Sequence, residues 1–384
     1  MTTPHNPRDI LIHVHEYLSG QGFFYTRQAI ANLYLSLKTK PFVILAGPSG
    51  TGKTQMVRLF AEALGHRDHC LLVPVRPDWA DSSELLGYVD YQGVYRHKPL
   101  LNWVLRAHQR PEEPFFVILD EMNLARVEHY LSEFLSIIET RRWENGEIVT
   151  APLLGLLPEQ LRPEDQRLAE LGWPANLCLV GTVNMDETTF GLSPKVLDRA
   201  QVIEVSEVRL DWPASSEEIP PMEGVKADFL QTKFLQGNDL SEEDKLRLRP
   251  AMQWLQKVSA ALAPVGLALG YRIRDELAFY LINRVAIREL ISEGEALDRQ
   301  LVQKILPRLQ GASPRYGEVL PQLLALLHPE ALKDVSDLRQ VPFGTLREKV
   351  GPKTTQPRPF PQATDKLMAM YQRFEEGGFT TFWD

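Results

Sequence analysis

Short runs of consecutive apolar residues recur along the first half of the chain, separated by segments in which apolar residues return every three or four positions. Uninterrupted runs rich in β-branched and aromatic residues are typical of strands buried on both faces. Their alternation with amphipathic helices predicts a parallel sheet with helices on both sides. The expected strands are 42–46, 71–75, 115–119, 177–182 and, with a weaker pattern, 201–205.

The remaining segments read as helices and linkers. Residues 8–38 have helical periodicity, 211–224 are rich in proline and acidic residues, and 250–345 are helix-like without a convincing strand. Proline-rich and glycine-rich stretches of this kind separate folded parts. We therefore expect a helical lead-in (1–39), an α/β core (40–210), a linker or insert (211–249), a helical domain (250–348), and a linker with a C-terminal tail (349–384).

The first expected strand runs into a glycine-rich loop. The glycines allow backbone angles that a Cβ forbids, so that successive N–H groups can surround phosphate oxygens. In such a loop the lysine reaches the β- and γ-phosphates and the last hydroxyl holds Mg²⁺, while the N-terminus of the following amphipathic helix faces the same phosphates. The strand–loop–helix context predicts a nucleoside triphosphate site made of Gly47, Pro48, Ser49, Gly50, Thr51, Gly52, Lys53 and Thr54.

Polar residues also follow two other expected strands. Asp120 and Glu121 end the run FFVIL, where one carboxylate can hold Mg²⁺ and the next can polarise an attacking water. A solvated pair, or a cap of the next helix, is the alternative. Asn184 ends the run beginning at residue 177 and could hydrogen-bond the same water or the γ-phosphate; otherwise it caps a turn.

Arginines in two places could complete the site. Arg199 precedes the last expected strand and could reach a nucleotide on a neighbouring subunit, or it could pair with the adjacent Asp198. Arg272 and Arg274 begin a later amphipathic helix. One of them, with Arg272 favoured, could contact the γ-phosphate; the alternative is that both pair with nearby carboxylates.

The composition narrows the class of protein. With 44% hydrophobic and 24% charged residues in 384, the chain can bury large cores, and its length predicts two or three domains. A net charge of −8 argues against non-specific coating of nucleic acid. The two distant cysteines argue against a zinc site or a disulfide framework. We find no signal peptide or spanning segment, so we expect a cytoplasmic protein without a membrane partner.

Several stretches together resemble the AAA+ ATPases, and more specifically the McrB-like branch within the dynein-related group. The resemblance extends from about residue 25 to the end of the chain. It is carried by LKTKPFVILAGPSGTGKT, VRPDWADSSELLGY, LDEMNLARVEHYLSEFLSIIETR, GTVNMDETTFGLSPKVLDRAQVIEV, KILPRLQG and GFTTFW.

This resemblance implies a P-loop AAA+ parallel sheet with helices on both faces, followed by a helical lid domain. It implies binding of ATP or GTP with Mg²⁺, a homo-oligomeric ring that we expect to be hexameric, and a McrC-like nuclease partner acting on DNA. The implied roles are nucleotide loop for 47–54, Mg²⁺ binding for Thr54 and Asp120, water activation for Glu121, sensor one for Asn184, arginine finger for Arg199 and sensor two for Arg272.

The chain departs from that branch in two respects. The restriction GTPase has an Asn-Thr-Ala-Asp-Arg signature where this chain reads NMDETT, so the preference between ATP and GTP stays open. The residues before the core are too few for a domain that reads modified bases, because a domain needs at least ~50 residues. We expect target recognition on a partner or on a further segment.

Two segments resemble inserts of the dynein-related group. Residues 87–101 match the insert in the second helix, or form an ordinary hairpin. Residues 139–155 match an insert before sensor one, whose Arg141 and Arg142 could face a pore or could be solvated helix-end cations. Three functions share this site: a motor for a nuclease, a MoxR-type remodelling chaperone, and a nucleotide-dependent assembly switch.

Overall fold

The computed structural model describes residues 6–156, 158–185, 189–210, 218–335, 337–338, 341–352 and 358–383. The chain divides into two compact units, Met1–Leu235 and Gln236–Asp384. We expected the α/β part to end at residue 210, but the first unit continues to Leu235. The reason is that the Phe229 ring stacks on Tyr34 at 4.6 Å, and Lys38 Nζ donates to the carbonyls of Asp228 and Phe229.

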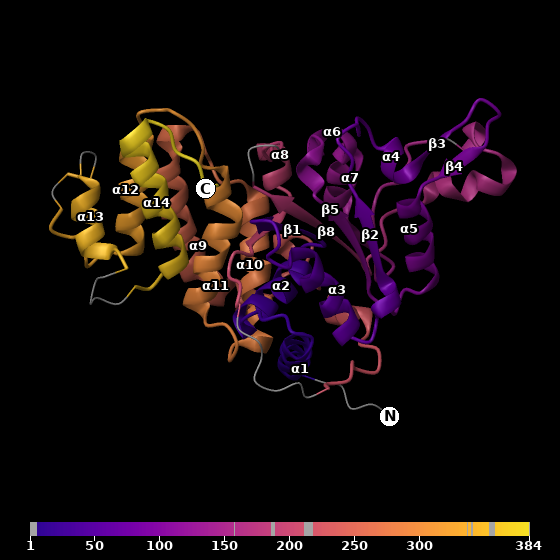
Figure 1. The fold of residues 1–384 in the computed structure, drawn as a ribbon, viewed down its shortest axis with the longest axis horizontal. Coiled ribbons are helices and arrows are strands. Elements are labelled where there is room, and N and C mark those ends of the chain that lie inside the picture. The colour runs from indigo at the N-terminus through magenta and orange to yellow at the C-terminus, as the bar shows by residue number, and fades with distance from the viewer. Residues whose placement is uncertain are drawn as a thin grey trace. The chain divides into compact units, whose positions relative to one another are not determined.

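The first unit contains a five-stranded parallel sheet with the strand order β2-β5-β8-β1-β9 (Figure 1). Each predicted strand is present, with ends within two residues of those expected, because long buried apolar runs are a strong local signal. The strands are β1 (Phe42–Gly47), β2 (Cys70–Pro74), β5 (Phe115–Asp120), β8 (Leu177–Asn184) and β9 (Gln201–Glu204).

Helices cover both faces of this sheet, as the sequence predicts. Neighbouring residues of a strand point to opposite faces. On β5, Phe116 meets Phe60 of α3 at 6.3 Å, while Phe115 meets Trp103 of α5 on the other face at 5.6 Å. The helices of this unit are α1 (Pro7–Gly20), α2 (Arg27–Thr39), α3 (Lys53–Ala63), α4 (Ser83–Leu86), α5 (Pro99–Gln109), α6 (Val127–Tyr130), α7 (Ser132–Ile137) and α8 (Pro194–Leu197).

Both segments that resemble inserts form antiparallel hairpins. Strands β3 (Gly87–Val89) and β4 (Tyr95–His97) project from the first unit beside α4 (Figure 1), and Tyr91 at their turn is 93% exposed. Strands β6 (Arg142–Glu144) and β7 (Glu147–Val149) form the second hairpin. There the exposed Arg142 forms an ion pair with Glu144 at 2.8 Å.

The second unit is helical. Helix α9 begins at Glu242, where the Ser241 hydroxyl accepts from the Asp244 N–H, and it continues through Pro250. A buried ion pair joins Glu276 of α10 to Lys304 at 2.7 Å, on a π-helical turn that continues α11. The helices are α9 (Glu242–Leu262), α10 (Tyr271–Arg284), α11 (Glu293–Gln300), α12 (Tyr316–Leu327), α13 (Phe343–Val350) and α14 (Pro361–Gly377).

Membrane-spanning helices were not expected from the sequence. In the part of the chain that the structure describes, no helix combines the length and the apolar character needed to cross a bilayer.

Candidate nucleotide site

The glycine-rich loop lies between β1 and α3. Gly50 and Gly52 have φ of 80° and 84°, which a Cβ would strain, and Gly52 caps the N-terminus of α3. At Gly47, with φ of 154°, an added Cβ would lie 2.2 Å from the Val205 carbonyl oxygen. Glycine is therefore needed at these positions for the loop to curl beside the sheet. The phosphate-loop prediction requires this path of the loop.

The lysine of the loop points into it. Lys53 is 6% exposed, and its Nζ donates to the carbonyls of Gly47 at 2.9 Å and Pro48 at 2.6 Å. Burial lowers the pKa of this amine, while the nearby carboxylates of Asp120 and Glu121 raise it. The amine is thus held by two backbone carbonyl oxygens at the place where the loop curls.

The other side chains of the loop lie toward its outside. Pro48, Ser49 and Gly50 are exposed, and Thr51 donates its hydroxyl hydrogen to the Pro48 carbonyl at 3.0 Å. A phosphate group in the loop would therefore meet the backbone N–H groups and Lys53 rather than these side chains.

The two residues expected to hold Mg²⁺ contact each other. The Thr54 hydroxyl at the start of α3 donates to Asp120 Oδ1 at the end of β5, at 2.6 Å. Hydroxyl, carboxylate and phosphate oxygens are the donors that Mg²⁺ takes up in P-loop proteins. The chemistry of this pair therefore fits Mg²⁺ next to the loop.

The proposed water-activating residue has a strained backbone. Glu121 has φ of 50° and ψ of 49°, an uncommon conformation for a residue with a side chain. Its carboxylate accepts from Asn184 Nδ2 at 2.8 Å. The structure thus brings together the carboxylate and the amide that the sequence placed on separate strands, since β8 lies between β5 and β1.

Thr182 is a site residue that the sequence analysis missed. Its hydroxyl donates to Asp120 Oδ1 and accepts from the Glu121 N–H, both at 2.9 Å. A threonine within an apolar strand gives no signal of its own. Its position two residues before Asn184 could have indicated Thr182, because residues i and i+2 of a strand share a face.

Asn123 is a second missed residue, fully buried behind the acidic pair. Its side-chain Nδ2 donates to the Asn184 carbonyl at 2.8 Å and to the Phe190 carbonyl at 3.3 Å, and its backbone carbonyl accepts from the Phe190 N–H. These bonds fasten the end of β8 to the loop after β5, which fixes the position of the Asn184 amide.

The lead-in also touches the phosphate loop. Tyr25, between α1 and α2, donates its hydroxyl hydrogen to the Gly52 carbonyl at 2.8 Å. This contact could not be predicted from the sequence, because the two residues are 27 positions apart and no motif joins them.

The three candidate arginines belong to other segments of the chain. Arg199 precedes β9, whose Gln201 pairs with Val43 at the start of β1, whereas the loop follows the end of β1. Arg272 and Arg274 belong to the second unit, in the first turn of α10. There Arg274 pairs with Asp275 at 2.7 Å and lies over the Tyr271 ring. Their part in the site therefore stays a prediction, and the NMDETT stretch is only partly covered, since 186–188 lie outside the described residues.

Comparisons with known proteins give two family matches. Residues 42–200 match the AAA domain of the dynein-related subfamily, and residues 218–379 match a domain of unknown function (DUF8727). No curated protein matches the sequence.

Solved structures also match. One is a candidate ATPase of Cytophaga hutchinsonii ATCC 33406, at 14% identity and a TM-score of 0.41, covering 78% of this chain and 87% of that one. Another is Hsp104 in its closed state with ATPγS and FITC-casein, at 16% identity and a TM-score of 0.34, covering 51% of this chain and 36% of that one. The stretch that matches the dynein-related AAA domain, residues 42–200, contains the phosphate loop and four of the five strands of the parallel sheet, β1, β2, β5 and β8.

Proposed function

We propose that this chain is a ring-forming AAA+ NTPase that hydrolyses ATP or GTP and drives or regulates a partner nuclease acting on DNA. The observation that carries hydrolysis is the 2.8 Å contact from Asn184 Nδ2 to Glu121 Oε1, next to the Thr54–Asp120 pair and the phosphate loop. A site for binding alone needs the loop and the lysine. A carboxylate held by an amide beside them is the arrangement that orients a water for attack.

The residues divide the work between binding and chemistry. The loop N–H groups and Lys53 hold the phosphates, and Thr54 and Asp120 hold Mg²⁺, which neutralises charge on the phosphates when it is bound. Glu121 accepts a proton from the attacking water, and Asn184 positions either Glu121 or that water. Thr182 keeps both carboxyl-bearing residues in place through its two hydrogen bonds.

Assembly into a ring is supported by the position of Arg199. Gln201 pairs with Val43, four residues before Gly47, so at ~3.3 Å per residue Arg199 lies more than ~13 Å along the sheet from the loop of its own chain. An arginine that cannot reach its own loop is suited to reach the nucleotide of a neighbouring copy. We propose a hexamer with each nucleotide at a subunit boundary.

A nuclease partner is supported by the sequence resemblance to the McrB-like branch and by the hairpin β6–β7. Arg141 precedes that hairpin and Arg142 opens it; the Arg142 side chain is half exposed and pairs with Glu144, which it would exchange for an acidic polymer. The net charge of −8 makes such a contact local rather than a general property of the surface. We therefore propose that DNA is engaged through the complex with a McrC-like nuclease.

Two measurements on one preparation test this proposal. The first is turnover of ATP against GTP, with and without DNA and the neighbouring gene product. The second is a pulldown on the tagged full chain from its native cells. We expect turnover that rises with the partner and recovery of a nuclease. Recovery of a metalloenzyme client would indicate a MoxR-type chaperone, and negligible turnover with partner and DNA present would indicate an assembly switch.

A further inference from the structure

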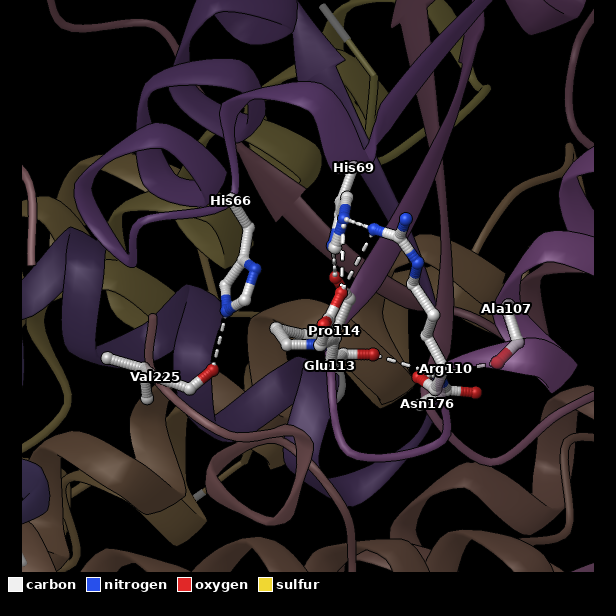
Figure 2. A network of polar contacts seen from close by, with 8 residues as sticks. All are labelled: His66, His69, Ala107, Arg110, Glu113, Pro114, Asn176 and Val225. Carbon is white, nitrogen blue, oxygen red and sulfur yellow. Dashed lines mark hydrogen bonds and ion pairs between the residues drawn. The ribbon is translucent and has the colours of Figure 1, made fainter. Parts of the chain in front are cut away.

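Two histidines and a glutamate gather at the opposite end of α3 from the phosphate loop (Figure 2). His66 and His69 follow the C-terminus of α3, and Glu113 lies in the loop before β5. One ligand atom from each of the three lies within 4.8 Å of the other two. The cluster has no part in the nucleotide chemistry described above, and the two imidazoles are buried while the glutamate is partly exposed.

Each imidazole uses one of its two nitrogens to bond a backbone carbonyl. His66 Nε2 lies 2.7 Å from the Val225 carbonyl oxygen, and His69 Nδ1 lies 3.2 Å from the Pro114 carbonyl oxygen. A carbonyl oxygen only accepts, so each of these nitrogens carries the hydrogen and donates. The remaining nitrogens, Nδ1 of His66 and Nε2 of His69, then present lone pairs. A backbone carbonyl behind an imidazole is a common arrangement at protein metal sites.

The backbone around the cluster is firmly held. Asn176 Nδ2 donates to the carbonyls of Ala107, Arg110 and Glu113 at 2.8 to 3.1 Å, which fixes the loop that carries the glutamate (Figure 2). Behind His66, the Val225 N–H donates to the Leu64 carbonyl. These bonds hold the backbone around the three side chains in place, as a binding site requires.

A cation already faces two of these ligand atoms. The Arg110 guanidinium lies 3.4 Å from His69 Nε2 and 3.5 Å from Glu113 Oε2. His69 Nε2 also lies 3.3 Å from Glu113 Oε2, so the three side chains of His69, Arg110 and Glu113 meet at one point. Burial lowers the pKa of the His69 imidazole, and the neighbouring His66 adds to this.

From this geometry we propose that His66 Nδ1, His69 Nε2 and the Glu113 carboxylate bind a divalent transition metal of the zinc class, with water as the fourth ligand. Two imidazoles, one carboxylate and an open position form a ligand set that Zn²⁺ takes up. The cysteine spacing, from which we argued against a zinc site, has no bearing on ligands of this kind. A bound metal would join the end of α3 to the start of β5.

Binding requires a small contraction. Tetrahedral Zn²⁺ with bonds of about 2.0 Å needs ligand atoms roughly 3.3 Å apart. The imidazole rings lie 5.0 Å apart and 23° from parallel, so one ring must turn to aim its lone pair at the metal. The Glu113 side chain is 41% exposed and the Arg110 side chain 50%, so the first can rotate inward while the second moves out to solvent.

Cobalt absorption tests the proposal directly. We would titrate the tag-free, nucleotide-free full chain with Co²⁺ and follow visible absorption, then displace Co²⁺ with Zn²⁺. We expect one Co²⁺ per chain with tetrahedral bands. The bands should be lost in His69→Ala, and affinity should fall in Glu113→Gln, which changes a partly exposed side chain and spares the core. Arg110→Gln should raise affinity by about five- to tenfold, because it removes the competing cation.

Two controls separate this site from others. His108→Ala, which changes an exposed histidine of the same unit, should keep the bands, and so should Asp120→Asn at the nucleotide site. If no tetrahedral bands form at one Co²⁺ per chain, or at any excess up to about millimolar metal, the proposal is overturned. Bands that persist unchanged in both His69→Ala and Glu113→Gln would overturn it as well. Neither result bears on nucleotide turnover, which is measured separately.

Discussion

Glu121 shows how a single residue combines strain with function. Its left-handed backbone costs of order 1–3 kcal/mol and persists because the Thr182 hydroxyl accepts from its N–H. This conformation turns the carboxylate toward Asn184 rather than along the strand. Strain of this kind is common where a side chain must be aimed at a reacting group.

We predict that Thr182→Val lowers turnover by about 10- to 100-fold with little change in nucleotide affinity. Valine keeps the volume but loses the bonds to Asp120 Oδ1 and the Glu121 N–H. Steady-state kcat and KM measure the effect. Thr182→Ser retains the hydroxyl and is the matched control, with turnover near that of the wild type. Equal turnover in the valine and serine variants would remove Thr182 from the site.

At this scale the sequence predicted the residues with strong local signals. Gly47 to Thr54, Asp120 and Glu121 stand in recognisable motifs, and the structure places them together. Thr182, Asn123 and Tyr25 were missed because each acts through a partner on another strand or loop. Which strands become neighbours depends on packing of the whole sheet, so these contacts have no local pattern.

At the scale of elements, the strands were predictable and their order was not. Apolar runs mark β1, β2, β5, β8 and β9 individually, whereas the order β2-β5-β8-β1-β9 follows from how the helices cross between them. The start of α9 was placed too late, at 250 instead of Glu242. Pro250 resembles a helix start, yet here α9 continues through it from a Ser241 cap.

Helices α12 and α14 meet at a buried histidine in the second unit. His328, 4% exposed, follows α12 and lies 2.7 Å from the Thr364 hydroxyl of α14. Burial lowers the pKa of His328 to about 4, and the Arg358 charge adds to this. In the unfolded chain its pKa is about 6.5.

We predict that His328→Gln flattens the loss of stability in acid. Between about pH 6.5 and pH 4 the unfolded chain binds a proton here that the folded chain does not, so the free energy of unfolding falls as pH falls, by up to about 3 kcal/mol. Unfolding temperature measured from pH 7.5 to 4.5 tests this. The exposed His129→Gln serves as the control, and parallel curves for wild type and His328→Gln would contradict the prediction.

For the whole molecule, the proposed ring requires contact between copies of the chain. Arg199 lies at the start of β9, far along the sheet from its own phosphate loop. The sequence alone suggested an arginine acting across a subunit boundary. The strand register supports that proposal because it places Arg199 far from the phosphate loop of its own chain.

We predict that Arg199→Ala lowers turnover of the assembled protein while the single subunit still binds nucleotide. Mixing Arg199→Ala with Glu121→Gln subunits should restore part of the activity, because some interfaces then pair an intact arginine with an intact glutamate. Turnover as a function of mixing ratio measures this. If mixtures only average the two inactive parents at every ratio, the arginine does not act in trans.

The central claim is that one site binds nucleotide through the loop and hydrolyses it through Glu121. The most direct measurement compares nucleotide affinity and turnover in Glu121→Gln and Lys53→Ala. We predict that Glu121→Gln binds within about threefold of wild type and loses turnover by about a hundredfold or more, whereas Lys53→Ala weakens binding by about tenfold or more. Wild-type turnover in Glu121→Gln would contradict the account.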